Sequence, residues 1–422
     1  MLKILQLVLK ALAKLILWRY RPKIIGITGS VGKTSAKEAI FSVLSGKFRI
    51  GKGLKNYNNE IGLPLTVIGA ESAGRSIVKW FLVFLKALSL ILIKHKNYPE
   101  ILILEMGIDK PGDMAYLLSI IRCDVAILTK IGESHLEFFG SVDSLEKEKG
   151  LLITSLEPNA FAILNADDAR AVGFKNKTRG RVITYALNNP ADIKGGNLNL
   201  RFDGNFFTDF DIIRHQDKSY HAQIPAFGSV FVEAALAAVA AGIAMNMNLG
   251  EIVERFERCH PPKGRMNIIP GIKQSIVIDD TYNSAPSSAI KAIESIGRFF
   301  PERRKIAVLG DMLELGEASE AGHFRVGQEA AKHDFNLLVA VGEQAKKITD
   351  GAIGSGLPSN LVYFFDNKNK AIDFLKNSVS RDDVILVKGS QGMRMEKIVE
   401  ALMASPEKAG ELLVRQDKDW LK

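Results

Sequence analysis

Residues 23–35 read KIIGITGSVGKTS, and this stretch decides the fold class. An apolar run typical of a buried strand breaks at Gly29 and Gly32, and Lys33 and Thr34 then begin a segment that we expect to be helical. A strand that ends in such a turn points backbone N–H groups and a helix N-terminus at one place, where a polyphosphate can bind. Lys33 would reach the outer phosphates, and the Thr34 hydroxyl would ligate Mg²⁺. The predicted phosphate-binding residues are Gly29, Ser30, Val31, Gly32, Lys33, Thr34 and Ser35.

This motif is the short form T-G-x-x-G-K-[ST], because the first glycine of the general P-loop pattern falls on Ile27. The alternative is an ordinary strand-to-helix turn. The strand, the turn, the lysine and the hydroxyl nevertheless occur in the required order, so we predict a nucleotide and Mg²⁺ site at the end of the first strand.

Length and composition narrow the class of protein. A chain of 422 residues is too long for one compact core, so we expect two or three domains. The formal net charge of +9 would attract nucleotides, acidic precursors or anionic lipid, but aromatic and basic residues do not interleave as in RNA-binding proteins, so we expect no nucleic-acid partner. Cys123 and Cys259 lie outside any C-x-x-C pattern, which argues against a zinc ribbon and fits the cytoplasm.

Residues 1–20, MLKILQLVLKALAKLILWRY, predict an amphipathic helix with a narrow polar stripe, a broad apolar face and Trp18 near its end. The segment has neither the uninterrupted apolar stretch nor the small-residue cleavage site of a signal peptide. A helix on the membrane surface and a helix packed on the body of the protein both stay open. The polar stripe consists of Lys3, Gln6, Lys10 and Lys14.

A second apolar stretch, IVKWFLVFLKALSLILI, covers residues 77–93 and contains Lys79 and Lys86. A membrane span needs about 20 mostly apolar residues, so this stretch predicts a second interfacial or packed helix. Two such helices make association with the inner face of the membrane a hypothesis for an otherwise cytoplasmic protein.

Polar side chains follow the later strands of the first half. Glu105 ends the strand pattern EILILEMG, where open α/β sheets place their sites, and would ligate the Mg²⁺ of the nucleotide. His135 follows the next strand, and we expect it to be functional rather than structural. Residues 141–153 predict a helix in which Lys149, by composition alone, belongs to a solvated charged face.

The chain divides at CHPPKGRM, residues 259–266, after an alanine-rich helix predicted over 232–247. Beyond this break the strand–helix alternation restarts without a second phosphate loop, so the second half should close over the nucleotide of the first. We predict an α/β protein with an N-terminal amphipathic helix (1–21), a mainly parallel-sheet central domain that carries the P-loop (22–263), and a smaller Rossmann-like α/β domain (264–422).

Nine motifs in series resemble those of the Mur ligase family: TGSVGKTS, NNEIGLPLT, LEMG with PGDMAYL, IGESHLEFFGS, EKEKG, KGRM, DDTYNSAPSS, GDMLELGEASEAGHFRVG and VKGSQGM. The resemblance runs from residue 23 to the end and is greatest to the branch that adds D-alanyl-D-alanine to the UDP-N-acetylmuramoyl tripeptide of peptidoglycan. It implies that ATP phosphorylates the terminal carboxylate of the muramoyl-peptide precursor and that an amine then attacks the acyl phosphate. Since these reactants are anions, cations must gather at the transfer point.

The resemblance also implies two Mg²⁺ ions and a set of catalytic residues. Thr34 and Glu105 would hold one ion, and His135 matches the ligand of the second. Lys149 matches a lysine that is carbamoylated in the family, and a carbamate offers the oxygen ligands that Mg²⁺ prefers. Arg265 matches the arginine that reaches the phosphates on closure, while Lys33 neutralises them.

Further residues are matched to the nucleoside and to the two substrates. Those expected at the ribose and adenine are Asp280, Tyr282 and Asn283. Asn58 and Asn59 fall where family members meet the muramoyl substrate. Lys388 and Ser390 lie near the expected site of the incoming amine. We expect a monomer.

Two departures from the family pattern stand out. The family branch usually carries a domain of roughly a hundred residues ahead of the phosphate loop that grips the UDP group, a size in the usual range for a small domain, whereas only the apolar helix precedes it here. A lipid-linked precursor would explain this difference together with the two apolar helices. In GSVFVEAALAA (228–238), Val230, Phe231 and Ala234 stand where the family has a His-Asn pair and a further Asn.

Two other functions remain open. One is a different amide ligase of the superfamily, similar to MurE or folylpolyglutamate synthase or acting on a lipid-linked precursor. The other is a nucleotide-binding membrane scaffold without catalysis. The joint presence of Lys33, Thr34, Glu105, His135 and Lys149 favours catalysis, because a scaffold needs only some of them.

Overall fold

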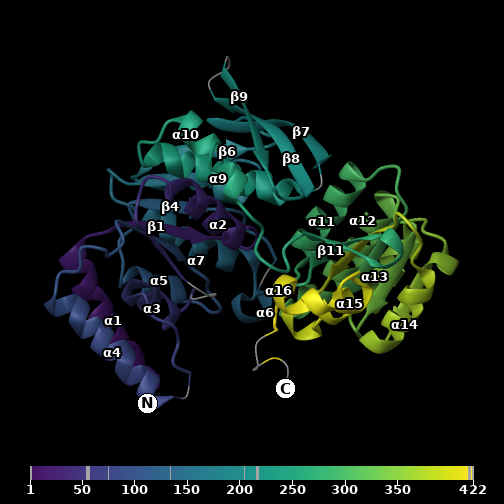
Figure 1. Ribbon diagram of the computed structural model, residues 1–422, viewed down its shortest axis with the longest axis horizontal. Coiled ribbons are helices and arrows are strands. Elements are labelled where there is room, and N and C mark those ends of the chain that lie inside the picture. The colour runs from purple at the N-terminus through teal and green to yellow at the C-terminus, as the bar shows by residue number, and fades with distance from the viewer. Residues whose placement is uncertain are drawn as a thin grey trace.

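Two sheets follow one another along the chain in the computed structural model, which describes residues 2–53, 58–74, 76–133, 135–203, 205–214, 218–416 and 420. The first sheet has the strand order β2-β3-β1-β4-β5-β6-β7-β8-β9 and the second β10-β11-β15-β12-β13-β14. Figure 1 shows them as two bodies side by side, with the first half on the left and the second on the right. The predicted α/β fold with a mainly parallel first sheet and a Rossmann-like second sheet is confirmed.

The first sheet is parallel from β2 to β7, and β7, β8 and β9 continue it as an antiparallel meander. Its strands are β1 (Lys23–Thr28), β2 (Ile50–Lys52), β3 (Ile101–Glu105), β4 (Val125–Leu128), β5 (Phe161–Asn165), β6 (Arg181–Ala186), β7 (Ile193–Asp203), β8 (Asn205–Arg214) and β9 (Lys218–Ile224). Its helices are α1 (Leu2–Tyr20), α2 (Lys33–Leu44), α3 (Gly62–Ile68), α4 (Ile77–Leu92), α5 (Asp113–Leu118), α6 (Leu136–Phe139), α7 (Val142–Thr154), α8 (Ala169–Val172), α9 (Ser229–Ala244) and α10 (Leu249–Val253).

Both faces of the parallel part are covered by helices, which explains its nearly continuous apolar strands. Ile25 and Ile27 of β1 belong to the core shared with α2 and α9. Ile24, on the opposite face, belongs to the core shared with α1, α3, α4, α5 and α7. The alanine-rich helix is buried as predicted but begins at Ser229 and ends at Ala244.

The second sheet is parallel except for β10, which runs antiparallel to β11. Its strands are β10 (Asn267–Pro270), β11 (Ile276–Asp280), β12 (Lys305–Gly310), β13 (Leu337–Val341), β14 (Val362–Phe365) and β15 (Val384–Lys388). Its helices are α11 (Pro286–Phe299), α12 (Ser319–Lys332), α13 (Lys346–Gly354), α14 (Lys368–Ser378), α15 (Glu396–Leu402) and α16 (Ala409–Leu412). Single 3-10 turns are η1 (Phe256–Arg258), η2 (Ile272–Gln274), η3 (Gly316–Ala318), η4 (Ser359–Leu361), η5 (Gln391–Met393) and η6 (Pro406–Lys408).

The two apolar segments at the start of the chain are helical, as predicted. The first is α1, although Met1 lies outside the described residues, and the second is α4. Among the described residues, no helix is both long enough and apolar enough to cross a membrane.

Ion pairs join the two halves. Glu133 pairs with Arg325 and Glu233 pairs with Lys291. The carboxyl ends of β1 and β3 and the loop that follows β11 thereby face one cavity between the sheets.

Candidate active site

Residues from both halves of the molecule line the cavity between the sheets. The predicted site residues of the first half that line it are Ser30, Val31, Gly32, Lys33, Thr34, Ser35, Asn58, Glu105, His135 and Lys149. Those of the second half are Arg265, Asp280, Tyr282, Asn283 and Lys388. Positions up to about 350 residues apart in sequence therefore converge on one place, as the parallel topology of both sheets requires.

The phosphate loop has a backbone that only glycine adopts without strain at two positions. Gly29 has φ of +146° and Gly32 of +87°, and a Cβ on Gly29 would lie 2.0 Å from Thr129 Oγ1. The Thr129 hydroxyl donates to the Val31 carbonyl at 2.7 Å, so the residue after β4 fixes the loop. These contacts explain why the turn needs glycine where the motif places it.

Two buried lysine amines share a single acceptor in this loop. Lys33 Nζ donates to the Gly29 carbonyl oxygen at 2.7 Å and Lys149 Nζ donates to the same oxygen at 3.2 Å. Burial lowers the pKa of Lys33 and lowers that of Lys149 well below its usual value. The charge of Arg265 adds to the shift of Lys33, and the charge of Lys33 adds to that of Lys149. Within the described residues neither amine forms an ion pair with a carboxylate. Binding of a polyanion beside these amines would therefore be favourable.

Lys149 differs from the exposed position that its composition predicted. Its side chain is 1% exposed. In α7 it lies four residues after Leu145 and three before Leu152, both of them buried, so helical spacing places it on the inner face. Spacing from these leucines could have predicted its burial, whereas the charged composition of the helix could not.

Oxygen ligands suited to Mg²⁺ meet beside the loop. The Thr34 hydroxyl lies 3.2 Å from both carboxylate oxygens of Glu105, which is 7% exposed. Lys37, which the sequence reading missed, is also buried, with Nζ 3.5 Å from Glu105. A hydroxyl and a carboxylate are the donors Mg²⁺ uses when phosphates complete its coordination, so Thr34 and Glu105 fit one ion.

His135 lines the cavity and directly precedes α6, in a strained backbone conformation. It has φ of +56°, and its Nδ1 lies 2.8 Å from Glu314 Oε2 of the second half. Burial lowers its pKa and the Glu314 carboxylate opposes that shift. Asp109, which the sequence reading missed, also lines the cavity, and its charge partly offsets the lowering of the pKa of Lys33, Lys149 and His135. Its position four residues after Glu105, just beyond the end of β3, was the available signal.

Arg265 already extends from the second half to the phosphate loop. Its guanidinium donates to the Thr34 hydroxyl at 3.4 Å and lies over the Tyr282 ring, 4.2 Å from the centroid. Its Nε is buried and has no hydrogen-bond partner among the described groups. The arginine thus adds a guanidinium charge beside the Lys33 and Lys149 amines.

The loop after β11 is held by charges from its own half. Sheet register places Asp280 beside Lys388, and the Lys388 ammonium lies 2.6 Å from the Asp280 carboxylate. The same ammonium donates to the Asn283 carbonyl at 3.0 Å. Near the chain end, Arg415 donates to the Thr281 carbonyl at 3.1 Å and to the Tyr282 carbonyl.

Two predicted substrate residues lie outside the cavity lining. The Asn59 side chain accepts from the Gly62 N–H at 2.9 Å and caps the turn into α3, whereas Asn58 lines the cavity. The buried Ser390 hydroxyl accepts from the Leu313 N–H at 2.8 Å and donates to the Ser284 carbonyl at 3.2 Å. Both side chains are therefore engaged in local structure.

The positions at which this chain lacks the family's His-Asn pair lie in the wall of the cavity. Val230 and Phe231 line the cavity, and Ala234 is buried. This wall is apolar, so any nucleoside contact at Val230 and Phe231 side chains is by packing.

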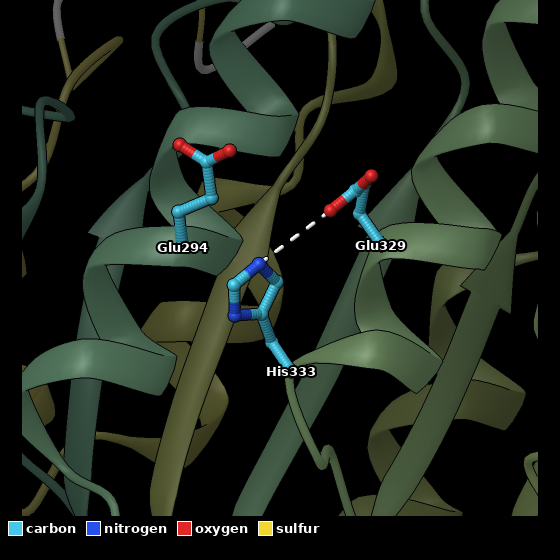
Figure 2. A group of neighbouring side chains, drawn as sticks. All are labelled: Glu294, Glu329 and His333. Carbon is cyan, nitrogen blue, oxygen red and sulfur yellow. Dashed lines mark ion pairs between the residues drawn. The ribbon is translucent and has the colours of Figure 1, made fainter.

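A further group of possible metal ligands lies away from the cavity. Figure 2 shows Glu294 of α11 facing Glu329 and His333, with His333 Nε2 3.5 Å from Glu329 Oε2. Glu294 is exposed, and the arrangement is accounted for by the His333–Glu329 ion pair.

Comparison with known proteins matches both halves. The model of the Mur ligase middle domain matches residues 85–242, and that of the Mur ligase glutamate ligase domain matches residues 264–391. The UDP-N-acetylmuramoyl-tripeptide--D-alanyl-D-alanine ligase of Bacillus subtilis is 29% identical over 398 residues, which cover 94% of this chain and 79% of the relative. The Escherichia coli ligase of the same name is 28% identical over 384 residues, covering 90% and 76%. The crystal structure of the MurF ligase from Thermotoga maritima in complex with ADP is similar with a TM-score of 0.77 and 25% identity, covering 96% of this chain and 84% of that one.

Proposed function

This chain belongs to the Mur ligase family, and from that premise we propose that it is an ATP-dependent amide ligase of peptidoglycan precursor synthesis. We propose that it adds D-alanyl-D-alanine to a muramoyl tripeptide, as the names of its relatives in Bacillus subtilis and Escherichia coli indicate for those proteins. The observation that carries the proposal is the gathering of Lys33, Lys149 and Arg265 around one loop from both halves of the molecule.

The reaction needs cations where a phosphoryl group passes between anions. In the proposed first step, a carboxylate oxygen of the tripeptide bonds to the γ-phosphorus of ATP, and the bond from that phosphorus to ADP breaks. Lys33 would exchange the Gly29 carbonyl for a phosphate oxygen, and Arg265 would donate to the moving phosphoryl group. In the second step the dipeptide amine bonds to the acyl carbon, loses a proton, and inorganic phosphate leaves.

Mg²⁺ would neutralise the phosphates when bound, and the chain supplies ligands for it. We assign Thr34 and Glu105 to one ion and His135 to a second. Because burial lowers the pKa of Lys149, its amine is available in the neutral form that attacks CO₂ to give a carbamate and a proton. That carbamate would give the second ion an oxygen ligand in addition to the His135 ring nitrogen.

The carbamate is tested by ¹³C NMR of protein incubated with ¹³C-bicarbonate. We expect a carbamate resonance in the unaltered protein and none in the Lys149→Ala variant. A spectrum that is the same for both proteins would remove this part of the proposal.

The remaining proposals concern the domains, the substrate positions and the location of the protein. We propose that residues 22–263 and 264–422 are the two domains, that Asp280, Tyr282 and Asn283 face the ribose and adenine, and that Asn58 faces the muramoyl group. The protein would act in the cytoplasm, with residues 1–20 and 77–93 against the inner face of the membrane.

A coupled assay of ADP release tests the proposed reaction. We expect ADP to form at an appreciable rate only when UDP-N-acetylmuramoyl tripeptide and D-alanyl-D-alanine are both present. L-alanyl-L-alanine is the matched control for the amine substrate. Turnover that is indifferent to both substrates would instead support a nucleotide-binding scaffold.

A lipid-linked muramoyl tripeptide is the second candidate acceptor, favoured by the exposed apolar side chains of α1 and α4. The same assay with that acceptor in detergent micelles decides between the two carriers. Product from the lipid-linked acceptor alone would assign the enzyme to membrane-held precursors.

A further inference from the structure

The helices α1 and α4 turn apolar side chains toward solvent. We call this surface the α1–α4 face, and its members are 41–85% exposed. On α1 they are Ile4, Leu7, Val8, Leu15 and Trp18. On and just after α4 they include Val78, Phe81, Leu85, Leu88, Leu92 and Ile93. Contiguous apolar surface of this extent marks an interaction site, whereas single exposed residues do not.

Both helices are anchored by their opposite sides. Leu9, Ala13 and Ile16 of α1 are fully buried, and Val83 and Ala87 of α4 enter the same core. Because both helices pack inward on one core, their apolar outer sides face away from it together. Figure 1 shows the pair side by side at the edge of the molecule, remote from the second sheet.

Contacts at the C-terminal ends fix the two helices to each other. The Tyr20 hydroxyl donates to the Ile93 carbonyl at 3.0 Å, and the Arg19 guanidinium donates to the Leu92 carbonyl at 3.3 Å. The Tyr20 and Tyr98 rings stack at 4.0 Å. These contacts hold the two parallel helices in a fixed arrangement, so the α1–α4 face has a defined shape.

The charged side chains of the two segments that form this face all have one sign. Residues 2–23 and 76–98 contain ten lysine and arginine residues and no aspartate or glutamate. Since the whole chain has a formal net charge of +9, everything outside these two segments has a net charge of −1. The basic character of the protein is thus concentrated beside its exposed apolar surface.

We infer that the α1–α4 face docks on an anionic lipid bilayer, with both helices lying in the plane of the headgroups. An apolar centre, a basic surround and an aromatic residue such as Trp18 match that environment. Eight of the ten cations are lysines, which protein–protein interfaces disfavour, so a lipid surface fits better than a protein partner.

Docking on a bilayer would also orient the cavity. Helix α3 packs between the α1–α4 pair and the first sheet, and it begins three residues after the Asn59 that follows Asn58 of the cavity lining. The part of the cavity assigned to the muramoyl group would then lie toward the membrane. This orientation rests on the proposed function, but docking itself does not require the ligase reaction.

Flotation of the full-length protein on lipid vesicles tests the inference. We expect most of the protein to float with phosphatidylcholine vesicles containing ~30% phosphatidylglycerol, and much less with phosphatidylcholine alone or in high salt. The Leu85→Glu variant should lower the partition coefficient at least tenfold, because it places a charge at the centre of the face. Ile353→Glu on α13 is the matched control, since Ile353 and Leu85 are each 46% exposed, and it should float like the unaltered protein.

Two results would overturn docking. One is failure of the unaltered protein to float. If light scattering then shows a dimer that the Leu85→Glu variant dissociates, the face binds a second copy of the chain instead of a bilayer. The other is equal flotation of Leu85→Glu and Ile353→Glu. Ligase activity on the soluble UDP-linked acceptor is measured separately: flotation without activity contradicts the proposed reaction, and activity without flotation contradicts only the docking.

Discussion

Each sheet places buried lysine in the cavity, but the two sheets balance its charge differently. In the second sheet, Lys388 pairs with Asp280 at 2.6 Å across adjacent strands. On two helices that pack against the first sheet, Lys33 of α2 and Lys149 of α7 share the neutral carbonyl of Gly29. A lysine that already pairs with a carboxylate gains little binding free energy from a new anion. A lysine that has only a neutral carbonyl as its partner gains much more. The comparison teaches that the first sheet is prepared for phosphate and the second for holding the shape of its own loop.

Replacement of Lys33 should have the largest effect on activity. We expect Lys33→Ala to lower turnover by about 10³-fold, or about 4 kcal/mol, because the moving phosphoryl group loses a preorganised cation. The midpoint of urea unfolding should stay the same or rise, since no native ion pair is broken. Amide formation at the unaltered rate would show that the unbalanced charge does not serve phosphate.

Replacement of Lys388 should instead affect stability. Lys388→Met leaves the Asp280 carboxylate buried without its partner, so we expect a loss of about 4 kcal/mol of unfolding free energy. The double variant Lys388→Met/Asp280→Asn should recover most of this loss. Equal stability of the single and double variants in urea would mean that the pair is not the balanced unit described here.

Replacement of Lys149 should change the pH dependence of stability. The folded pKa of Lys149 lies below its unfolded value of 10.5, so the unfolded chain binds more protons between the two and stability rises with pH through that window. Lys149→Met lacks this rise. In CO₂-free buffer at pH 7 we expect the variant to be more stable, by about 1.4 kcal/mol per unit of pKa depression, with the difference vanishing toward pH ~10.5. Parallel pH profiles of the two proteins in urea unfolding would argue against a desolvated amine.

Replacement of Ser390 should have the smallest effect. Ser390→Ala removes a hydroxyl that bonds the Leu313 N–H and the Ser284 carbonyl, so a loss of about 1 kcal/mol is expected. The KM for D-alanyl-D-alanine should not change. A large rise in that KM would indicate that Ser390 contacts the dipeptide substrate after all.

The sequence predicted those parts that local pattern determines. The TGSVGKTS motif dictates the strand, the glycine turn and the helix that follows, because each residue type suits its own backbone conformation. Alternation of apolar strands with helices dictated two layered α/β halves. Glu105 and His135 could be placed because Glu105 ends a strand and His135 follows one, and both strands must end at the carboxyl edge of the sheet.

Other features depend on contacts between distant parts of the chain and were missed. Asn59 and Asn58 are neighbours in sequence, yet only one side chain turns into the cavity, and the turn before α3 decides which. The carboxylates of Glu133 and Glu314 meet Arg325 and His135, each from the other half of the molecule, and no local pattern encodes these pairings. The exposed apolar sides of α1 and α4 also become evident only once the inward sides are known.

The position of Arg415 has a consequence for biosynthesis. This residue, near the end of the chain, holds the carbonyl groups of Thr281 and Tyr282 and is itself held by Glu396 at 2.9 Å. A nascent polypeptide that has emerged from the ribosome only as far as α15 lacks that tether, although both sheets are already complete. The capacity to hold a nucleoside should therefore arise only after the residues beyond α15 have been made, and a truncation that removes Arg415 should weaken nucleotide binding.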